Sequence, residues 1–156
     1  MPQKILIAMD DSENAMRAVE MVADSFSTDN NITLFNIMLD TAALCQMDSP
    51  ALTPLFKSQQ ASFCALEDKK RELVMAMMNR AKEHLLESGF ADEKINIKVK
   101  NMDRGVARDI LHESRNGYDL IVTGRRGTSG IKEFFMGSTS QKIVSGAKDI
   151  SVLITN

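Results

Sequence analysis

Short apolar runs alternate along the chain with longer segments whose apolar residues recur every three or four positions. The continuous apolar runs are typical of strands buried on both faces of a parallel sheet, and they occupy residues 4–9, 32–38, 119–123 and 151–155. Residues 95–100 instead alternate between apolar and polar side chains. This alternation predicts a strand with one solvated face, near an edge of the sheet.

The segments between the strands carry apolar residues at helical spacing. Ser12 is placed to cap a helix after the first strand, and Gly105 precedes a second helix. A further helix is predicted over residues 139–147, with Ile143 and Val144 on its inner face.

The longest helical pattern covers residues 66–87, and Gly89 follows it as a residue suited to end a helix. The predicted core-facing stripe of this helix consists of Leu73, Val74, Met77, Ala81 and Leu85. The charged run at residues 67–71 is interpreted as a solvated helix face. Residues 40–65 show no clear period and are predicted to form a long loop insertion with at most a short helix. Such a loop serves as a lid, an oligomer contact or a solvated insertion.

The order of strands and helices predicts an α/β fold, with a parallel sheet covered by helices on both faces. We expect a single domain over residues 1–156. In such sheets, ligands bind beyond the carboxyl ends of strands, where the strand order reverses. Polar breaks at residues 10–12 and 124–127 both follow predicted strands. They face one crevice if those two strands are neighbours in the sheet.

Composition narrows the choice of partners. The formal net charge is −2, and no basic stripe with interleaved aromatic residues occurs, which argues against a nucleic-acid partner. No stretch approaches the ~20 apolar residues that a membrane helix needs, and the first apolar run is too short for a signal peptide. We therefore expect a cytoplasmic protein with no membrane partner.

The cysteines and histidines give no sign of a metal site. Cys45 and Cys64 fit neither a C-x-x-C redox motif nor a zinc-binding set. We expect two free thiols, buried or half-buried, in a reducing compartment. His84 and His112 lie in helical patterns without partners at metal-ligand spacing, so we expect surface or helix-packing roles for them.

Two glycine corners form the strongest candidate for a binding site. Gly124 and Gly127 follow a strand, and after nine further residues Gly137, Ser138 and Thr139 begin a helix. Glycines let the backbone approach a ligand closely. Hydroxyl groups beside the free N–H groups of a helix start suit phosphate. The sequence therefore predicts a phosphate site made of two parts.

Basic residues lie within and beside the same stretch, at Arg125, Arg126 and Lys132, where they are able to pair with phosphate oxygens. The stretch is neither a P-loop nor a G-x-G-x-x-G dinucleotide motif. Simpler roles remain open at this point. The glycines suit ordinary turns, the hydroxyls suit helix caps, and Asp10 suits either ligand contact or the end of the first strand.

The G-x2-G-x9-G-[ST] motif resembles that of the ATP-binding universal stress proteins. Residues 10–12 are similar to that family's D-x-S turn, residues 105–107 to its G-x-[PA] turn, and residues 152–154 to its final strand. The resemblance implies a three-layer fold with an open, five-stranded parallel sheet of order 3-2-1-4-5. It also implies a homodimer, often formed through the last strand.

The resemblance further implies which residues hold an adenine nucleotide. The residues carried over are Ala8, Met9, Asp10, Ile37, Thr123, Gly124, Arg126, Gly127, Gly137, Ser138 and Thr139. Asp10 corresponds to the adenosine end, Ile37 flanks the adenine, and the segment from Gly137 holds the phosphates. Three departures are present: Asn36 stands where the family often has His, residues 149–151 lack the common Pro, and two arginines between the first glycines are a more basic choice than usual.

The function implied by the resemblance is regulation of a stress response by a bound adenine nucleotide, namely ATP, ADP or AMP, with or without Mg²⁺. An alternative is a slow ATPase or self-phosphorylating switch, in which Asp10 and Asp11 hold a metal and Ser138 or Thr139 accepts phosphate. No well-placed general base is evident, so weak hydrolysis is the most that we expect. A third possibility is a nucleotide-free interaction module that uses residues 40–65 as its contact surface.

Overall fold

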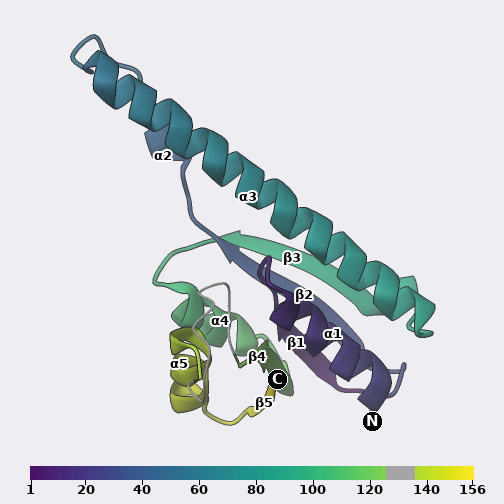
Figure 1. Ribbon diagram of the computed structural model, residues 1–156. Helices are drawn as coiled ribbons and strands as arrows, with labels where there is room; N and C mark the ends of the chain where they lie inside the picture. The colour runs from purple at the N-terminus through teal and green to yellow at the C-terminus, as the bar shows by residue number, and fades with distance from the viewer. Residues whose placement is uncertain (126–135) are drawn as a thin grey trace.

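The computed structural model describes residues 1–125 and 136–156. Within these residues the centre of the fold is a five-stranded parallel sheet of order β3-β2-β1-β4-β5. Its strands are β1 (Lys4–Ala8), β2 (Asn31–Met38), β3 (Ile95–Asn101), β4 (Leu120–Gly124) and β5 (Ser151–Thr155). The predicted sheet and strand order are confirmed, and the alternating strand β3 lies at an edge, as predicted (Figure 1).

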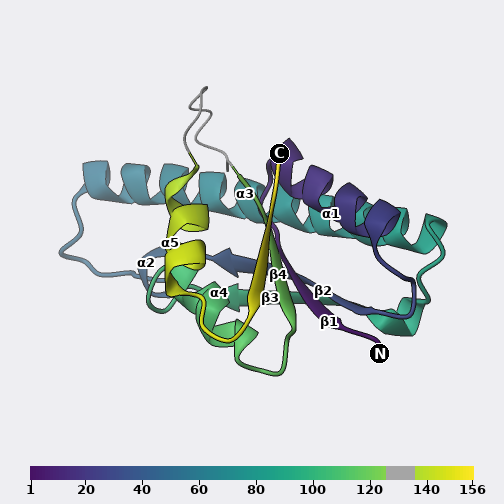
Figure 2. The same cartoon turned by 90° about the horizontal axis from the view of Figure 1, so that it is seen from below.

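Helices cover both faces of the sheet (Figure 2). The helices α1 (Glu13–Ser25) and α3 (Pro54–Glu87) lie on one face, while α4 (Val106–Ser114) and α5 (Ser138–Gly146) lie on the other. A short helix α2 (Ala42–Cys45) and a 3-10 turn (Asp92–Lys94) complete the described elements. The Ser12 side chain caps α1 by accepting a hydrogen bond from Ala15 N at 3.3 Å.

The alternation of side chains along the strands divides the core into two layers. Ile5 and Ile7 of β1 face the α1 and α3 side, whereas Leu6 between them faces α4 and α5. Tyr118 and Ile143 belong to the second layer. Because both layers are filled, both faces of β1 are buried, which explains its continuous apolar run.

Helix α3 differs from its prediction at both its start and its buried stripe. It begins at Pro54, capped by Thr53, so residues 40–65 contain α2 and the first turns of α3 in addition to loop. The buried residues of α3 are Val74, Met78, Ala81 and Leu85. The prediction was wrong at Leu73, which is 49% exposed, and Met77 is only partly buried. Leu73 lies about 100° around the helix from Val74, off the line of the buried residues. The first half of α3 extends beyond the sheet (Figure 1).

Helix α5 differs from its prediction on one residue. Ile143 is fully buried against the sheet, as predicted, but Val144 is 44% exposed. Neighbouring positions on a helix are about 100° apart, so a short helix that packs along a narrow line buries only one of two adjacent apolar residues.

The two cysteines are joined, so the prediction of free thiols was wrong. Cys45 and Cys64 form a disulfide with an S–S distance of 2.06 Å. Gln60 adds two hydrogen bonds beside it, from its Nε2 to the carbonyl oxygens of Leu44 and Met47, at 2.5 and 3.0 Å. Residues 42–66, here called the α2–α3 hairpin, are thus tied together. The pairing was not visible in the sequence, because it depends on residues 54–65 being helical.

A buried carboxylate links α4 to the edge strand β3. Glu113 is 1% exposed, and its Oε1 accepts hydrogen bonds from Lys98 Nζ at 2.7 Å and Tyr118 Oη at 3.2 Å. Lys100 Nζ lies 3.4 Å from Oε2. Burial by itself raises the pKa of Glu113, but the hydrogen bonds and charges of Lys98 and Lys100 outweigh burial and hold this pKa below the ordinary value of 4.5.

We expect Lys98→Met to lower the free energy of unfolding by about 2 kcal/mol at pH 7, because it leaves a buried carboxylate with fewer partners. The lowered pKa of Glu113 stabilises the wild type above about pH 4.5, and this stabilisation is lost as the pH falls through the folded-state pKa. The difference between the two proteins should therefore shrink in acid. Urea unfolding at pH 7 and pH 3 measures it, with the exposed Lys57→Met as control. Equal stability of the two variants at pH 7 would contradict the expectation.

Candidate functional site

A cavity of about 340 Å³ opens where the carboxyl ends of β1, β2 and β4 meet the start of α5. All the predicted site residues that the structure describes line this cavity. They are Ala8, Met9, Asp10, Ile37, Thr123, Gly124, Gly137, Ser138 and Thr139. Arg126 and Gly127 were also predicted, and they lie outside the described residues. Gly124 and Gly137, one described glycine from each corner, thus line the same cavity.

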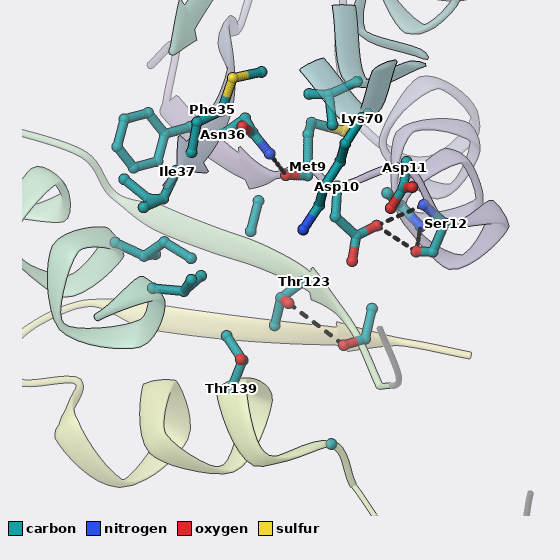
Figure 3. A pocket seen from close by; sticks show the side chains of 18 of the residues that line it. Met9, Asp10, Asp11, Ser12, Phe35, Asn36, Ile37, Lys70, Thr123 and Thr139 are labelled. Carbon is teal, nitrogen blue, oxygen red and sulfur yellow. Dashed lines mark hydrogen bonds between the residues drawn. The ribbon is translucent and has the colours of Figure 1, made fainter. Parts of the chain in front are cut away.

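Asp10 sits in the turn between β1 and α1. Its Oδ1 accepts a hydrogen bond from Ser12 N at 2.8 Å and a second one from the Ser12 hydroxyl. Ser12 in turn caps α1. The carboxylate therefore fixes the turn and also lines the cavity, so the structural and ligand-binding roles proposed for it are compatible (Figure 3).

Asn36 fixes the neighbouring end of β1. It is 5% exposed, and its Nδ2 donates a hydrogen bond to the Met9 carbonyl oxygen at 2.7 Å. Met9 N donates in turn to the carbonyl oxygen of Phe35, also at 2.7 Å. The Asn at this position thus holds the ends of β1 and β2 together and positions Asp10, which follows Met9.

The start of α5 is tied directly to the end of β4. Ser140 Oγ donates to the Gly124 carbonyl oxygen at 2.6 Å, and Gly137 N donates to the Arg125 carbonyl oxygen at 2.7 Å. The first N–H groups of a helix have no partners within the helix, and the helix dipole makes this end favourable for anions. Because Ser138 and Thr139 line the cavity, its α5 side is suited to phosphate.

Another part of the cavity lining is apolar. This part includes Phe35 and Ile37 of β2, Val74 of α3, and Val106 and Ile110 of α4. Phe35, Val74 and Ile110 also belong to the two core layers, so this surface is rigidly supported. An apolar surface next to a helix start suited to anions fits a ligand with a flat base at one end and anionic groups at the other.

Three charged residues of α3 complete the wall of the cavity, and none of them was among the predicted site residues. Residues 68–71 are exposed and Glu67 is half-buried, which agrees with the predicted solvated face, and Glu67, Lys70 and Arg71 also line the cavity. Their spacing places them on the same side of α3 as the buried Val74. The sequence shows this spacing, but only the packing of α3 on the sheet shows that this side of the helix lines the cavity.

Residues 1–125 and 136–156 contain no cluster of three or more His, Cys, Asp or Glu side chains placed to hold a metal ion. No helix among these residues has the length and apolar character needed to cross a membrane.

Comparisons with known proteins agree with this architecture. The sequence profile described as Universal stress protein family matches residues 1–156. The chain is 27% identical over 141 residues to Universal stress protein YxiE of Bacillus subtilis (strain 168), with 90% of each chain covered. Its fold is similar to that of universal stress protein UspA from Lactobacillus plantarum, with a TM-score of 0.68, 20% identity, and coverage of 99% of this chain and 97% of the other.

Another solved structure of similar fold is a universal stress protein in complex with cAMP. The TM-score is 0.64 at 16% identity, and the match covers 99% of this chain and 97% of that one.

Proposed function

The chain belongs to the universal stress protein family, and from that premise we propose that it binds an adenine nucleotide, with ATP as its main ligand, and acts as a nucleotide-dependent regulator in a stress response. One observation carries the proposal. A single cavity of about 340 Å³ is lined by the turn at Asp10, by Ile37 of β2, by the end of β4 and by the start of α5.

In this proposal the adenine lies against the apolar part of the cavity, beside Ile37, Val106 and Ile110. The ribose lies near Asp10, and the phosphates accept hydrogen bonds from the start of α5. The neighbour solved with cAMP, itself an adenine nucleotide, supports this class of ligand. Any Mg²⁺ enters with the nucleotide, held by phosphate oxygens and water, because the described residues include no cluster of metal ligands.

The proposal includes a homodimer and a cytoplasmic location. Strand β5 is an edge strand of the sheet, and its outer backbone groups are suited to pairing with a second copy of the same strand. Disulfides of cytosolic proteins are usually transient. In that compartment the Cys45–Cys64 bond would form and open with the redox state of the cell.

Titration calorimetry with ATP, ADP and AMP tests the proposal. We expect Asp10→Asn to weaken nucleotide binding about tenfold, because a hydrogen bond to a charged carboxylate is replaced by a weaker one to a neutral amide. Asn keeps an oxygen able to accept the hydrogen bonds of Ser12, so the turn should persist. Asp24→Asn, on the exposed side of α1, is the matched control. The absence of binding heat for all three nucleotides at millimolar concentration would reject the proposal and leave the interaction-module alternative.

A further inference from the structure

The wall of the cavity opposite α5 carries two positive charges. Lys70 and Arg71 of α3 both line the cavity. Figure 3 shows the Lys70 side chain extending past Met9 and Asp10, with its ammonium group pointing into the cavity. Val74, one turn further along α3, is buried in the core and lines the same cavity. The two basic residues are therefore presented by a helix whose next turn is anchored.

Neither of these cations forms an ion pair within residues 1–125 and 136–156. Other basic residues of α3 do form such pairs: Lys69 with Glu72 at 3.6 Å, Arg80 with Glu13 at 3.5 Å, and Lys82 with Asp92 at 2.7 Å. The Asp10 carboxylate beside Lys70 is engaged by Ser12 through its Oδ1. The positive charge of Lys70 and Arg71 thus remains available to an anion that enters the cavity.

The helix is held over the cavity from its other end as well. The Cys45–Cys64 disulfide joins α3 to the α2 segment, with Cys64 less than two turns before Lys70. Gln60 fastens the same segment through its two hydrogen bonds. Leu39, which precedes α2, itself lines the cavity. Side chains that bind a ligand act most strongly when the element that carries them is fixed in this way.

We infer that Lys70 and Arg71 bind the terminal phosphates of the nucleotide and make the site select nucleoside triphosphates over monophosphates. This inference rests on the proposed nucleotide function. An α-phosphate satisfies the start of α5, whereas the longer anion of a triphosphate also reaches across to the basic wall of α3. Electrostatic attraction from both walls grows with the charge of the ligand.

Glu67 provides a second test, because replacing it should change the preference for ATP in the opposite direction. It lines the cavity one turn before Lys70 and Arg71, on the same side of α3. Its carboxylate repels phosphate and partly offsets the two cations. Neutralising Glu67 should therefore favour the triphosphate, while neutralising the cations should disfavour it.

The experiment is titration calorimetry of the full chain with ATP and with AMP, in buffers of low and high salt. We expect the wild type to prefer ATP over AMP by more than tenfold at low salt. The double variant Lys70→Gln/Arg71→Gln should lose about tenfold in ATP affinity and less than about threefold in AMP affinity, so that the preference collapses. Glu67→Gln should raise ATP affinity about twofold, and added salt should narrow the preference of the wild type.

The control is Lys69→Gln, which removes one positive charge from an adjacent residue that does not line the cavity. It should leave both affinities unchanged. If no nucleotide binds to the wild type, the proposed function fails and this inference fails with it. If nucleotides bind but the double variant, folded by circular dichroism, keeps the wild-type ratio of ATP to AMP affinity, the inference alone is overturned.

Discussion

Gly137→Glu is expected to lower adenine-nucleotide affinity by more than about a hundredfold while the protein remains folded. Gly137 lines the cavity and immediately precedes α5. A carboxylate there meets the phosphates directly, and such contacts between like charges cost several kcal/mol. The fold tolerates the change, because Gly137 has φ −58° and ψ 154°, which residues with side chains readily adopt. A negative charge before a helix also interacts favourably with the helix dipole.

Titration with ATP measures the effect, and thermal unfolding checks that the protein is folded. Gly137→Gln is the matched control, because it adds a side chain of nearly the same size without the charge. It should retain clearly more affinity than Gly137→Glu. Equal affinities of the two variants would show that bulk alone acts at this position, and wild-type affinity in Gly137→Glu would place the phosphates elsewhere.

Opening the Cys45–Cys64 bond is expected to raise amide hydrogen exchange in the α2–α3 hairpin about a hundredfold. Helix α3 has no buried residue before Val74. Its first half therefore depends on the disulfide and the Gln60 hydrogen bonds more than on the core. The disulfide closes a loop with a sequence separation of 19 residues. Closing a loop of that size raises the free energy of opening by roughly 3 kcal/mol. This corresponds to about a hundredfold in the opening equilibrium.

The variant for this test is Cys45→Ser/Cys64→Ser, which leaves no free thiol at the pair, and reduced wild-type protein should behave like it. Amides of β1 and β4 serve as the internal reference, since both strands lie in the sheet centre, away from the hairpin. Their exchange should stay close to wild type, because local opening of a peripheral segment does not require the core to unfold. Unchanged exchange at residues 57–66 would show that the Gln60 hydrogen bonds alone hold the hairpin.

The sequence by itself determined which segments form the sheet and where the two glycine corners lie. These features are local. A strand buried on both faces needs a continuous apolar run, and a helix that packs on a sheet needs apolar residues at its own period. The edge position of β3 followed from its alternation in the same way. The motif at Gly124 and Gly137, together with the family resemblance, was sufficient to name the residues that the structure brings to one cavity.

Tertiary structure alone decided the features that depend on contacts between distant segments. The first half of α3 has no apolar stripe, because it extends past the sheet, so neither its helical form nor the Cys45–Cys64 bond had a local signature. Lys70 and Arg71 look like surface charges until the packing of α3 against β2 and β3 places them at the cavity. Local periodicity records which side of a segment is buried, but the position of that segment relative to others is set by packing across the whole fold.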